Sequence, residues 1–408
     1  MVRIAIIGCG IVGTSIAFEL SQFPELKVTV FDKQPPAQGA TGAALGVLMG
    51  VISHKTKGRN WHLRETSLQR YETLIPELEA ITGRKIPFNK QGILMLCSEG
   101  DDLSKWEKLI AIRQSQGWNL ELWDVERVRE FCPHLYLNDK IIAAIYSPQD
   151  RQVDPTALTL ALIDAAERNG VIFEFGVAVE GLTGGQDASP TNNFMPYGTG
   201  ILPVIENGAG GQDASPTNNF RPCGTGILSV IENGAKHQIQ TSSSKLEFDR
   251  LIVAAGLGST AVTASLNQLV DIRPVLGQAL HLRLKNPLGN PDFAPVITCD
   301  DVHIVPLANQ ECWVGATVEF PENGGEIPAN ADRLEEVMAR ARSLCPALAE
   351  AQIIKQWSGL RPRPEGRPAP IIETLAGNSR VLVASGHYRN GVLLAPATAR
   401  SIREMILQ

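Results

Sequence analysis

The sequence has no cluster of basic residues and no long apolar run. Its 37 lysines and arginines are outnumbered by 43 acidic residues, which gives a formal net charge of -6. A nucleic-acid partner is therefore not expected, because phosphate binding requires a basic surface. The longest nearly apolar stretch, 4–18, is too short to span a bilayer and contains three glycines. We therefore expect no membrane partner.

The chain also lacks paired cysteines and a recognisable signal peptide. The seven cysteines form no Cys-x-x-Cys pair, and an odd count argues against a disulfide framework and a zinc site. The first residues lack the basic, apolar and small-residue regions of a signal peptide. We expect a cytoplasmic protein, a reducing compartment and no metal. The cysteines are Cys9, Cys97, Cys132, Cys223, Cys299, Cys312 and Cys345.

The composition is that of a globular protein. Hydrophobic residues make up 44% and charged residues 20% of the 408 residues, which is too apolar for a disordered chain. At roughly 150 residues per domain, this length predicts two to three domains, each with its own core.

A tandem repeat interrupts this ordinary sequence. Residues 184–209 are followed by 210–235, and 23 of 26 positions are identical, with Pro203 of the first copy replaced by Ser229 in the second. Two copies are too few for a solenoid, and they are rich in Gly, Pro, Asn, Ser and Thr. The pattern indicates a duplicated surface insertion that loops out and is partly flexible. A partner-binding module is the alternative.

Strand-like and helix-like patterns alternate in the remainder. The β-branched run 2–7 predicts a strand buried on both faces, 13–21 a helix and 28–31 another strand, which together make a βαβ unit. A helix is predicted over 154–169, because Asp154 can cap it and Gly170 can end it. Two further strands are predicted at 171–179 and 251–255. Alternating patterns indicate a largely antiparallel sheet from 91–97, 275–284, 302–305 and 312–318.

A Gly-x-Gly-x-x-Gly motif connects the first predicted strand to the first helix. Gly8 permits a tight turn, Gly10 lets the backbone approach a pyrophosphate, and Gly13 lets the helix pack on the strand. Asp32 ends the next strand 19 residues after Gly13, where its carboxylate can accept hydrogen bonds from an adenosine ribose. The motif predicts a dinucleotide site but does not separate FAD from NAD.

Other segments resemble the FAD-dependent glycine oxidases of the D-amino acid oxidase and sarcosine oxidase family. The resemblance covers essentially the whole chain except the repeat, and GHYRNGVLLAPAT is its most specific part. The segments are 40–49 (ATGAALGVLM), 147–155 (SPQDRQVDP), 251–256 (LIVAAG), 358–362 (SGLRP) and 384–398 (ASGHYRNGVLLAPAT).

This resemblance implies a set of residues that bind FAD. No cysteine follows the GLRP motif, where sarcosine oxidases attach their flavin, so FAD is expected to be bound noncovalently. Main-chain donors at the start of the last helix can stabilise negative charge on the reduced flavin. The implied residues are Gly8, Gly10, Ile11, Val12, Gly13, Asp32, Lys33, Ala40, Thr41, Leu45, Gly46, Val47, Val179, Gly256, His387, Tyr388, Arg389, Asn390, Gly391, Val392 and Leu393.

The resemblance also implies three substrate-binding residues. Arg361 in GLRP and Arg389 in GHYRNG match the two arginines of the family's pocket, and a guanidinium suits an amino-acid carboxylate. His303 stands where the family has a tyrosine before Ile-Val-Pro. It could donate from a ring nitrogen and would titrate near neutral pH, or it could be a packed strand residue without a substrate role.

The implied fold is α/β, with a Rossmann-like FAD-binding domain of the glutathione-reductase type and an interleaved α+β substrate domain carrying a largely antiparallel sheet. The first domain is expected at 1–85, 145–270 and 355–408, and the second at 86–144 and 271–354. The repeat, 184–235, would be inserted in the first.

The implied activity is oxidative deamination of glycine or another small amino acid, such as sarcosine or a D-amino acid. Hydride transfer to the flavin would give an imine, which hydrolyses to an oxo acid such as glyoxylate and ammonia, and reoxidation by O2 would give hydrogen peroxide. No side chain is expected to act as an acid or base. A link to thiamine thiazole synthesis and a homo-oligomer follow from the resemblance alone.

Three alternatives remain open. A D-amino acid or sarcosine dehydrogenase would share the fold and use another electron acceptor. A non-catalytic flavin-binding scaffold could use the repeat to recruit a partner. A NAD-dependent dehydrogenase would be colourless after purification.

Overall fold

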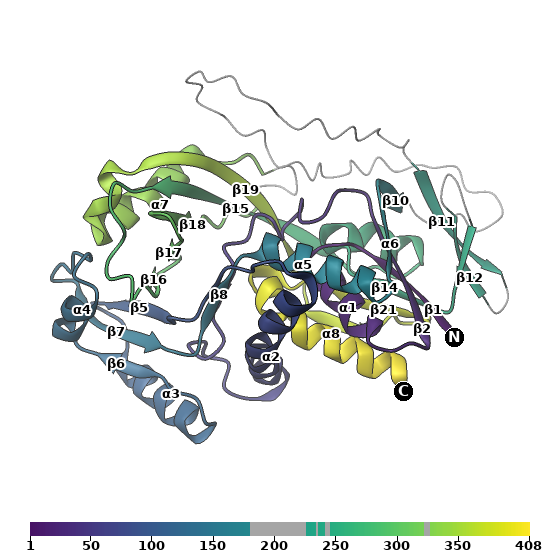
Figure 1. Ribbon diagram of the computed structural model, residues 1–408, viewed down its shortest axis with the longest axis horizontal. Coiled ribbons are helices and arrows are strands. Elements are labelled where there is room, and N and C mark those ends of the chain that lie inside the picture. The colour runs from purple at the N-terminus through teal and green to yellow at the C-terminus, as the bar shows by residue number, and fades with distance from the viewer. Residues whose placement is uncertain (180–225, 234–235, 241–244, 322–326) are drawn as a thin grey trace, which may run out of the picture.

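The computed structural model describes residues 1–179, 226–233, 236–240, 245–321 and 327–408. Figure 1 shows two regions side by side: a layered sheet and helices near both termini, and a second, larger sheet beside them.

The first region is built on a sheet of mostly parallel strands. In the described residues its order is β20-β21-β14-β1-β2-β9; β1, β2, β9, β14 and β21 run parallel, and β20 is antiparallel to β21. Strands β1 and β2, with the helix between them, form the predicted βαβ unit. The bounds are β1 (Val2–Ile7), β2 (Leu26–Asp32), β9 (Ile172–Phe175), β14 (Arg250–Val253), β20 (Ile371–Thr374) and β21 (Val381–Ser385).

Four helices cover one face of this sheet, and one short helix packs on the other. Alternate residues of β1 pack on opposite sides, Ile4 and Ile6 in the core beneath the helices and Ala5 and Ile7 in the core on the other face. Burial on both faces explains the continuous apolar run in this strand. The helices are α1 (Ile11–Ser21), α2 (Gly58–Thr82), α5 (Pro155–Arg168) and α8 (Gly391–Leu407), with α6 (Ser259–Ser265) on the opposite face.

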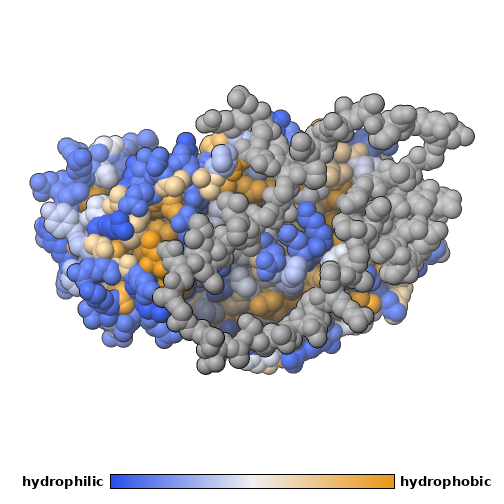
Figure 2. Space-filling model, turned by 90° about the horizontal axis from the view of Figure 1, so that it is seen from above, coloured by the Kyte–Doolittle hydropathy of each residue, from blue (hydrophilic) through white to orange (hydrophobic). Residues whose placement is uncertain are grey.

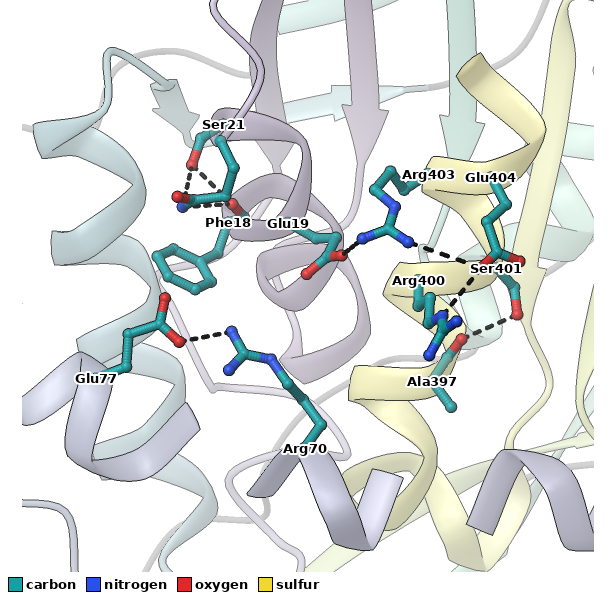
Figure 3. A network of polar contacts seen from close by, with 11 residues as sticks. Phe18, Glu19, Ser21, Arg70, Glu77, Ala397, Arg400, Ser401, Arg403 and Glu404 are labelled. Carbon is teal, nitrogen blue, oxygen red and sulfur yellow. Dashed lines mark hydrogen bonds and ion pairs between the residues drawn. The ribbon is translucent and has the colours of Figure 1, made fainter. Parts of the chain in front are cut away.

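Charged side chains connect these helices at their surface (Figure 3). Arg403 on α8 pairs with Glu19 on α1 at 2.6 Å, while Arg70 pairs with Glu77 within α2 at 2.7 Å. Partly exposed pairs of this kind contribute about 0 to 1 kcal/mol each. The apolar core between the helices therefore provides most of the stability.

The second region is a sheet in which nearly all neighbours are antiparallel. Its order in the described residues is β19-β15-β18-β17-β16-β5-β7-β6, and β5 with β16 is its parallel pair. The expected largely antiparallel sheet is confirmed. The strands are β5 (Ile93–Ser98), β6 (Glu121–Trp123), β7 (Ile141–Ser147), β15 (Ile272–Arg283), β16 (Val296–Cys299), β17 (Val302–Pro306), β18 (Glu311–Gly315) and β19 (Gln352–Pro364). The helices here are α3 (Leu103–Ser115), α4 (Val125–Phe131) and α7 (Ala331–Leu344).

Two smaller sheets complete the described structure. One has the order β3-β8-β4 and the other β10-β11-β12-β13. The single strand predicted at 171–179 is divided, because Gly176 adopts a φ of +79° between β9 and β10. The bounds are β3 (Val47–Leu48), β4 (Phe88–Asn89), β8 (Arg151–Val153), β10 (Val177–Val179), β11 (Gly226–Asn233), β12 (Lys236–Gln240) and β13 (Lys245–Phe248), and short 3-10 turns are η1 (Gly256–Gly258), η2 (Pro346–Glu350) and η3 (Tyr388–Asn390).

The tandem repeat lies mostly outside the described residues. Within the second copy, 226–233 forms β11, which pairs in parallel with β10 and antiparallel with β12. For these residues the expectation of a looped-out insertion is wrong. The segment GILSVIEN is rich in β-branched and aliphatic residues, which favour a strand over a loop.

Candidate active site

The predicted cofactor residues meet where the parallel strands of the first sheet end. The glycine turn follows β1, Asp32 ends β2, η1 follows β14 and η3 follows β21. Because these strands are parallel, their carboxyl ends share one edge of the sheet, which is where ligands bind in this type of fold.

The glycine turn has the geometry that a pyrophosphate requires. Gly8 adopts a φ of +107°, and a Cβ on Gly13 would lie 1.9 Å from the Gly8 carbonyl oxygen, so both positions exclude side chains. Gly10 is the N-cap of α1, and Ile11 and Val12 form the first turn. The Val12 N–H is at a helix N-terminus, where a phosphate is stabilised.

Asp32 fixes this turn from the end of β2. Its Oδ2 accepts a hydrogen bond from the Cys9 amide at 2.6 Å, and Oδ1 accepts one from the Gln34 amide at 2.9 Å. Burial raises the pKa of the Asp32 carboxyl, and the two amide donors act in the opposite direction. The remaining lone pairs suit ribose hydroxyls. The neighbouring Lys33 is exposed.

The segment after β2 returns to the glycine turn. Thr41 is buried, and its Oγ1 accepts a hydrogen bond from the Ile11 amide at 3.0 Å. Ala40 is exposed just before it. Gly46 has a φ of +70°, and a Cβ there would lie 1.8 Å from the Val153 carbonyl oxygen. Leu45 and Val47 then pack in a small core against the eight-stranded sheet.

A residue that was not predicted holds the continuation of this segment. The Asp150 carboxylate is fully buried and accepts hydrogen bonds from the amides of Gly50, Val51 and Ile52 at 2.7, 2.8 and 2.9 Å. The Ser147 hydroxyl donates a fourth, at 2.8 Å. Asp150 belongs to the SPQDRQVDP segment, and that was the available signal. Its partners are about a hundred positions away in sequence, so the spacing could not reveal them.

The predicted FAD-binding residues of the glycine turn, Asp32, 40–47, Gly256 and 387–393 are called the flavin cradle below. Its last part is the turn between β21 and α8. His387 is buried with its Nε2 2.9 Å from the Thr398 hydroxyl, and burial lowers the pKa of this imidazole to about 3. It is therefore neutral at physiological pH. Tyr388 has a φ of 54°, which is uncommon for a residue with a side chain. Arg389 and Asn390 complete η3, and Gly391, Val392 and Leu393 form the first turn of α8.

The two remaining predicted cofactor residues lie beside this edge. Gly256 begins η1, and its carbonyl accepts a hydrogen bond from the Ser385 hydroxyl at 3.2 Å, which connects the ends of β14 and β21. Val179 ends β10, a strand that packs through Val177 against the core containing Phe31 of β2.

Arg361 lies on β19 with part of its guanidinium already fixed. Nη1 donates to the carbonyl oxygens of Leu276 at 3.1 Å and Thr317 at 3.0 Å. Within the part of the chain that the structure describes, Nη2 and Nε have no hydrogen-bond partner. A Cβ on Gly277 would lie 2.3 Å from Nη1, so this glycine makes room for the guanidinium. The arrangement leaves donors available for a carboxylate.

Arg389 and His303 lie near Arg361. Arg389 pairs with Asp301 at 2.6 Å, and its side chain is 38% exposed. The Nδ1 of His303 is 3.0 Å from the Thr298 hydroxyl. Burial and, after it, the positive charge of Arg389 lower the pKa of His303 to about 4, although Asp301 opposes this effect.

Two of these features differ from the prediction. His303 does not titrate near neutral pH, because burial and two arginines disfavour its charged form. Asp301 was not predicted, although it stands only two positions before His303. Its carboxylate holds Arg389 in place in this structure.

Two tryptophans of the eight-stranded sheet contact each other, and one of them contacts the segment after β2. Trp357 on β19 donates from Nε1 to the Ala43 carbonyl at 3.1 Å, and its ring meets Trp313 edge to face with centroids 6.0 Å apart. Figure 2 shows apolar surface within a polar rim on the side that holds the eight-stranded sheet. Apolar surface beside a few fixed polar groups is typical of a small-molecule site.

Other kinds of site are not seen in the described residues. A surface hollow of about 410 Å³, lined by residues that include Leu68, Glu72, Trp118 and Arg151, contains none of the predicted site residues. Among the described side chains, no group of three or more His, Cys, Asp or Glu is placed to hold a metal ion. Of the helices in the described parts of the chain, none is both long and apolar enough to cross a membrane.

The observed cradle fits FAD. Gly8 and Gly13 exclude side chains in the turn where a pyrophosphate would lie, and the Asp32 carboxylate stands at the ribose position. The first turn of α8 would provide main-chain N–H groups beside the flavin ring. The fold and this cradle define a dinucleotide-dependent oxidoreductase. Arg361 beside the cradle has donors that suit an anionic group.

Comparison with known proteins identifies the family. The model of the FAD dependent oxidoreductase family, DAO, matches residues 3–193 and 223–405, and the chain therefore belongs to this family. The match passes over 194–222, which lies inside the tandem repeat. FAD is accordingly the cofactor, and the expected fold class is confirmed.

Several known proteins are similar over nearly the whole chain. A glycine oxidase of Bacillus licheniformis is 27% identical over 412 residues, which cover 98% of this chain and 92% of that protein. A bifunctional protein ThiO/ThiG of Trichormus variabilis is 27% identical over 99% of this chain, which spans only 52% of that protein. The crystal structure of glycine oxidase from Geobacillus kaustophilus has a TM-score of 0.79 at 22% identity and covers 100% of this chain and 95% of its own.

Proposed function

We propose that the protein catalyses FAD-dependent oxidative deamination of glycine or a similarly small amino acid. The observation that carries the proposal is the Arg361 guanidinium, which is half fixed by two carbonyls and half available beside the flavin cradle. Similarity to proteins named glycine oxidase over nearly the full length supports the same reaction.

The residues of this chain act by binding and orientation. Arg361 would donate paired hydrogen bonds to the two oxygens of the substrate carboxylate. The neutral His303 would add a ring nitrogen as a further donor. Arg389 would leave Asp301 or remain paired with it at the edge of the pocket. With the carboxylate held at one end, the Cα–H of a small amino acid is directed toward the cofactor.

Bound FAD supplies the oxidant, since it takes up a hydride from the substrate. No side chain of the site needs to act as an acid or base when the amine enters uncharged. The proposed overall reaction is amino acid, water and O2 to oxo acid, ammonia and hydrogen peroxide, with glyoxylate as the oxo acid when the substrate is glycine.

Several features of the wider role belong to the same proposal. The domain division given above, a cytoplasmic location and a homo-oligomer are part of it. The similarity to ThiO/ThiG proteins supports a link to thiamine thiazole synthesis.

The experiment that tests the proposal is the visible spectrum of the purified holoprotein under anaerobic conditions. Addition of glycine should bleach the flavin band, and admission of air should restore it and release one peroxide per turnover. A band that glycine, sarcosine and D-alanine all leave unchanged would contradict the proposed activity. Bleaching without recovery in air would instead indicate a dehydrogenase that uses another acceptor.

A further inference from the structure

Helix α8, which begins at the flavin cradle, contains a buried proline in its second turn. Pro396 has no N–H, so the carbonyl of Val392, four residues earlier, lacks its usual intrahelical donor. An unsatisfied carbonyl in a buried helix is costly. A replacement donor is therefore needed near Val392.

Tyr71 provides this donor from the neighbouring helix α2. Its hydroxyl lies 2.5 Å from the Val392 carbonyl oxygen, and the side chain is fully buried. Burial also raises the pKa of Tyr71, so the hydroxyl keeps its proton. A second contact joins the helices one turn away, where the Ser67 hydroxyl accepts a hydrogen bond from the Ala397 amide at 3.2 Å.

The Val392 carbonyl has a particular position relative to the cofactor. It belongs to the same peptide unit as the N–H of Leu393, which lies in the first turn of α8, where N–H groups have no intrahelical acceptor. A hydrogen bond to the oxygen of a peptide polarises its N–H and makes it a stronger donor. In the proposed site, the first turn of α8 is the part of the helix that faces the cofactor.

We propose that Tyr71 is a positioning residue for the flavin: its hydroxyl replaces the N–H that Pro396 lacks and polarises the Val392–Leu393 peptide toward the negative charge of the reduced cofactor. This inference rests on the flavin position proposed above. It concerns a side chain that touches neither substrate nor flavin and that no sequence motif marked.

The first test compares Tyr71→Phe with a matched control, Ser67→Ala, in the FAD-loaded protein. Both variants remove one hydroxyl from α2 and one hydrogen bond to α8. Two quantities report on negative charge at the flavin: the dissociation constant of sulfite, which adds to oxidised flavin as an anion, and the two-electron midpoint potential.

Tyr71→Phe is expected to weaken sulfite binding about threefold to tenfold, because the Leu393 donor becomes weaker. A tenfold change in the reduction equilibrium corresponds to a potential about 30 mV more negative. Ser67→Ala should leave both values within about twofold of the unmodified protein. Equal changes in the two variants, or no change in Tyr71→Phe, would show that Tyr71 has only a structural role.

A second test uses the proline itself. Pro396→Ala restores an N–H that can bond to Val392 within the helix, so the effect of Tyr71→Phe on sulfite binding should largely disappear in this background. An undiminished effect would overturn the inference. The double variant also keeps the test usable if Tyr71→Phe alone folds poorly, since the restored helix bond removes the unsatisfied carbonyl.

Failure of the underlying site is distinguishable. If the unmodified protein binds neither FAD nor sulfite, the proposed flavin position is wrong. If the unmodified protein binds both, and Tyr71→Phe has the same sulfite dissociation constant and midpoint potential, the proposed flavin site stands and the role of Tyr71 is refuted.

Discussion

Arg361 shows how the backbone prepares a side chain for its ligand. Two carbonyl oxygens, from β15 and from the residues after β18, fix Nη1, and the missing side chain of Gly277 gives the guanidinium its space. Burial lowers the pKa of Arg361, and nearby Arg389 adds to the effect. A bound carboxylate would offset the positive charge of Arg361, which burial and Arg389 disfavour.

Arg361→Ala should raise the KM for the amino acid about tenfold to a hundredfold, which corresponds to the loss of a charge-assisted hydrogen bond of about 1.5 to 3 kcal/mol. Bound FAD should be retained, because Arg361 does not belong to the cradle. Arg363→Ala is the control, since this residue lies on the same strand and pairs with Glu365 at 3.2 Å. Steady-state kinetics and anaerobic bleaching titrations measure the effect. An unchanged KM in Arg361→Ala would exclude this residue from the site.

His387 makes the stability of the protein depend on pH. Its imidazole is buried, and its pKa is lowered to about 3 from an ordinary value of 6.5. The unfolded chain therefore binds a proton between these values that the folded protein does not. The contribution of His387 to stability is present above pH 6.5 and is lost as the pH falls from 6.5 toward 3.

His387→Gln should reduce this dependence while an amide replaces the ring nitrogen that meets Thr398. Between pH 7.5 and 5 the unmodified protein should lose about 2 kcal/mol more unfolding free energy than the variant, at about 1.4 kcal/mol per pH unit below 6.5. Urea unfolding of both proteins at the two pH values, with FAD in excess, gives the difference. Parallel pH profiles would show that His387 is not buried in its neutral form.

At the scale of elements, local patterns predicted the parts of the chain whose structure depends on near neighbours. The strand at 2–7 has the predicted bounds, and the helix at 154–169 is capped by Asp154 as expected. Contacts between distant segments could not be predicted in this way. Tyr71 and Val392 are 321 positions apart, and neither residue type nor spacing identifies such a pair.

Asp150 is another such contact, and it is predicted to stabilise the segment that follows the flavin loop. Asp150→Asn would replace one of the two carboxylate oxygens by an NH2 group. This group cannot accept the hydrogen bonds that backbone amides and the Ser147 hydroxyl now donate. The expected loss is about 3 kcal/mol of unfolding free energy, because buried donors to a charged acceptor become unsatisfied. Asp164→Asn is the control, as this carboxylate, whose side chain is 24% exposed, pairs with Arg84 and Arg168 near the surface. If urea unfolding showed that both variants lose the same unfolding free energy, a stabilising role specific to Asp150 would be contradicted.

For the whole molecule, the resemblance predicted the family, the fold class and the cofactor, because the glycine turn and the GLRP and GHYRNG segments are local and specific. The same information could not describe His303 correctly. Its pKa depends on burial and on two arginines from other segments, and such a three-dimensional environment is not visible in the VHIVP motif. The prediction for the repeat likewise depends on its composition. Composition does not show that part of one copy can pair with strands outside the repeat, as 226–233 does with β10 and β12.

The repeat provides the last prediction, because its two copies differ at a position that matters for a strand. In the second copy Ser229 lies within β11, where it is opposite Gln240 of β12 and directly follows Leu228, which pairs with Val179 of β10. The corresponding residue of the first copy is Pro203. Proline cannot donate to a sheet ladder and is disfavoured inside a paired strand. The second copy is therefore suited to β11, and the first is not.

Deletion of 184–209 should leave stability and turnover close to those of the full chain, because the copy with Ser229 remains. Deletion of 210–235 leaves the sequence GILPVIEN for the same strand and should cost about 1 to 3 kcal/mol, the range for an unsatisfied backbone group. Ser229→Pro in the full chain isolates the decisive residue and should reproduce that loss in urea unfolding. Two deletion variants of equal stability, with a neutral Ser229→Pro, would show that strand β11 does not distinguish between the copies.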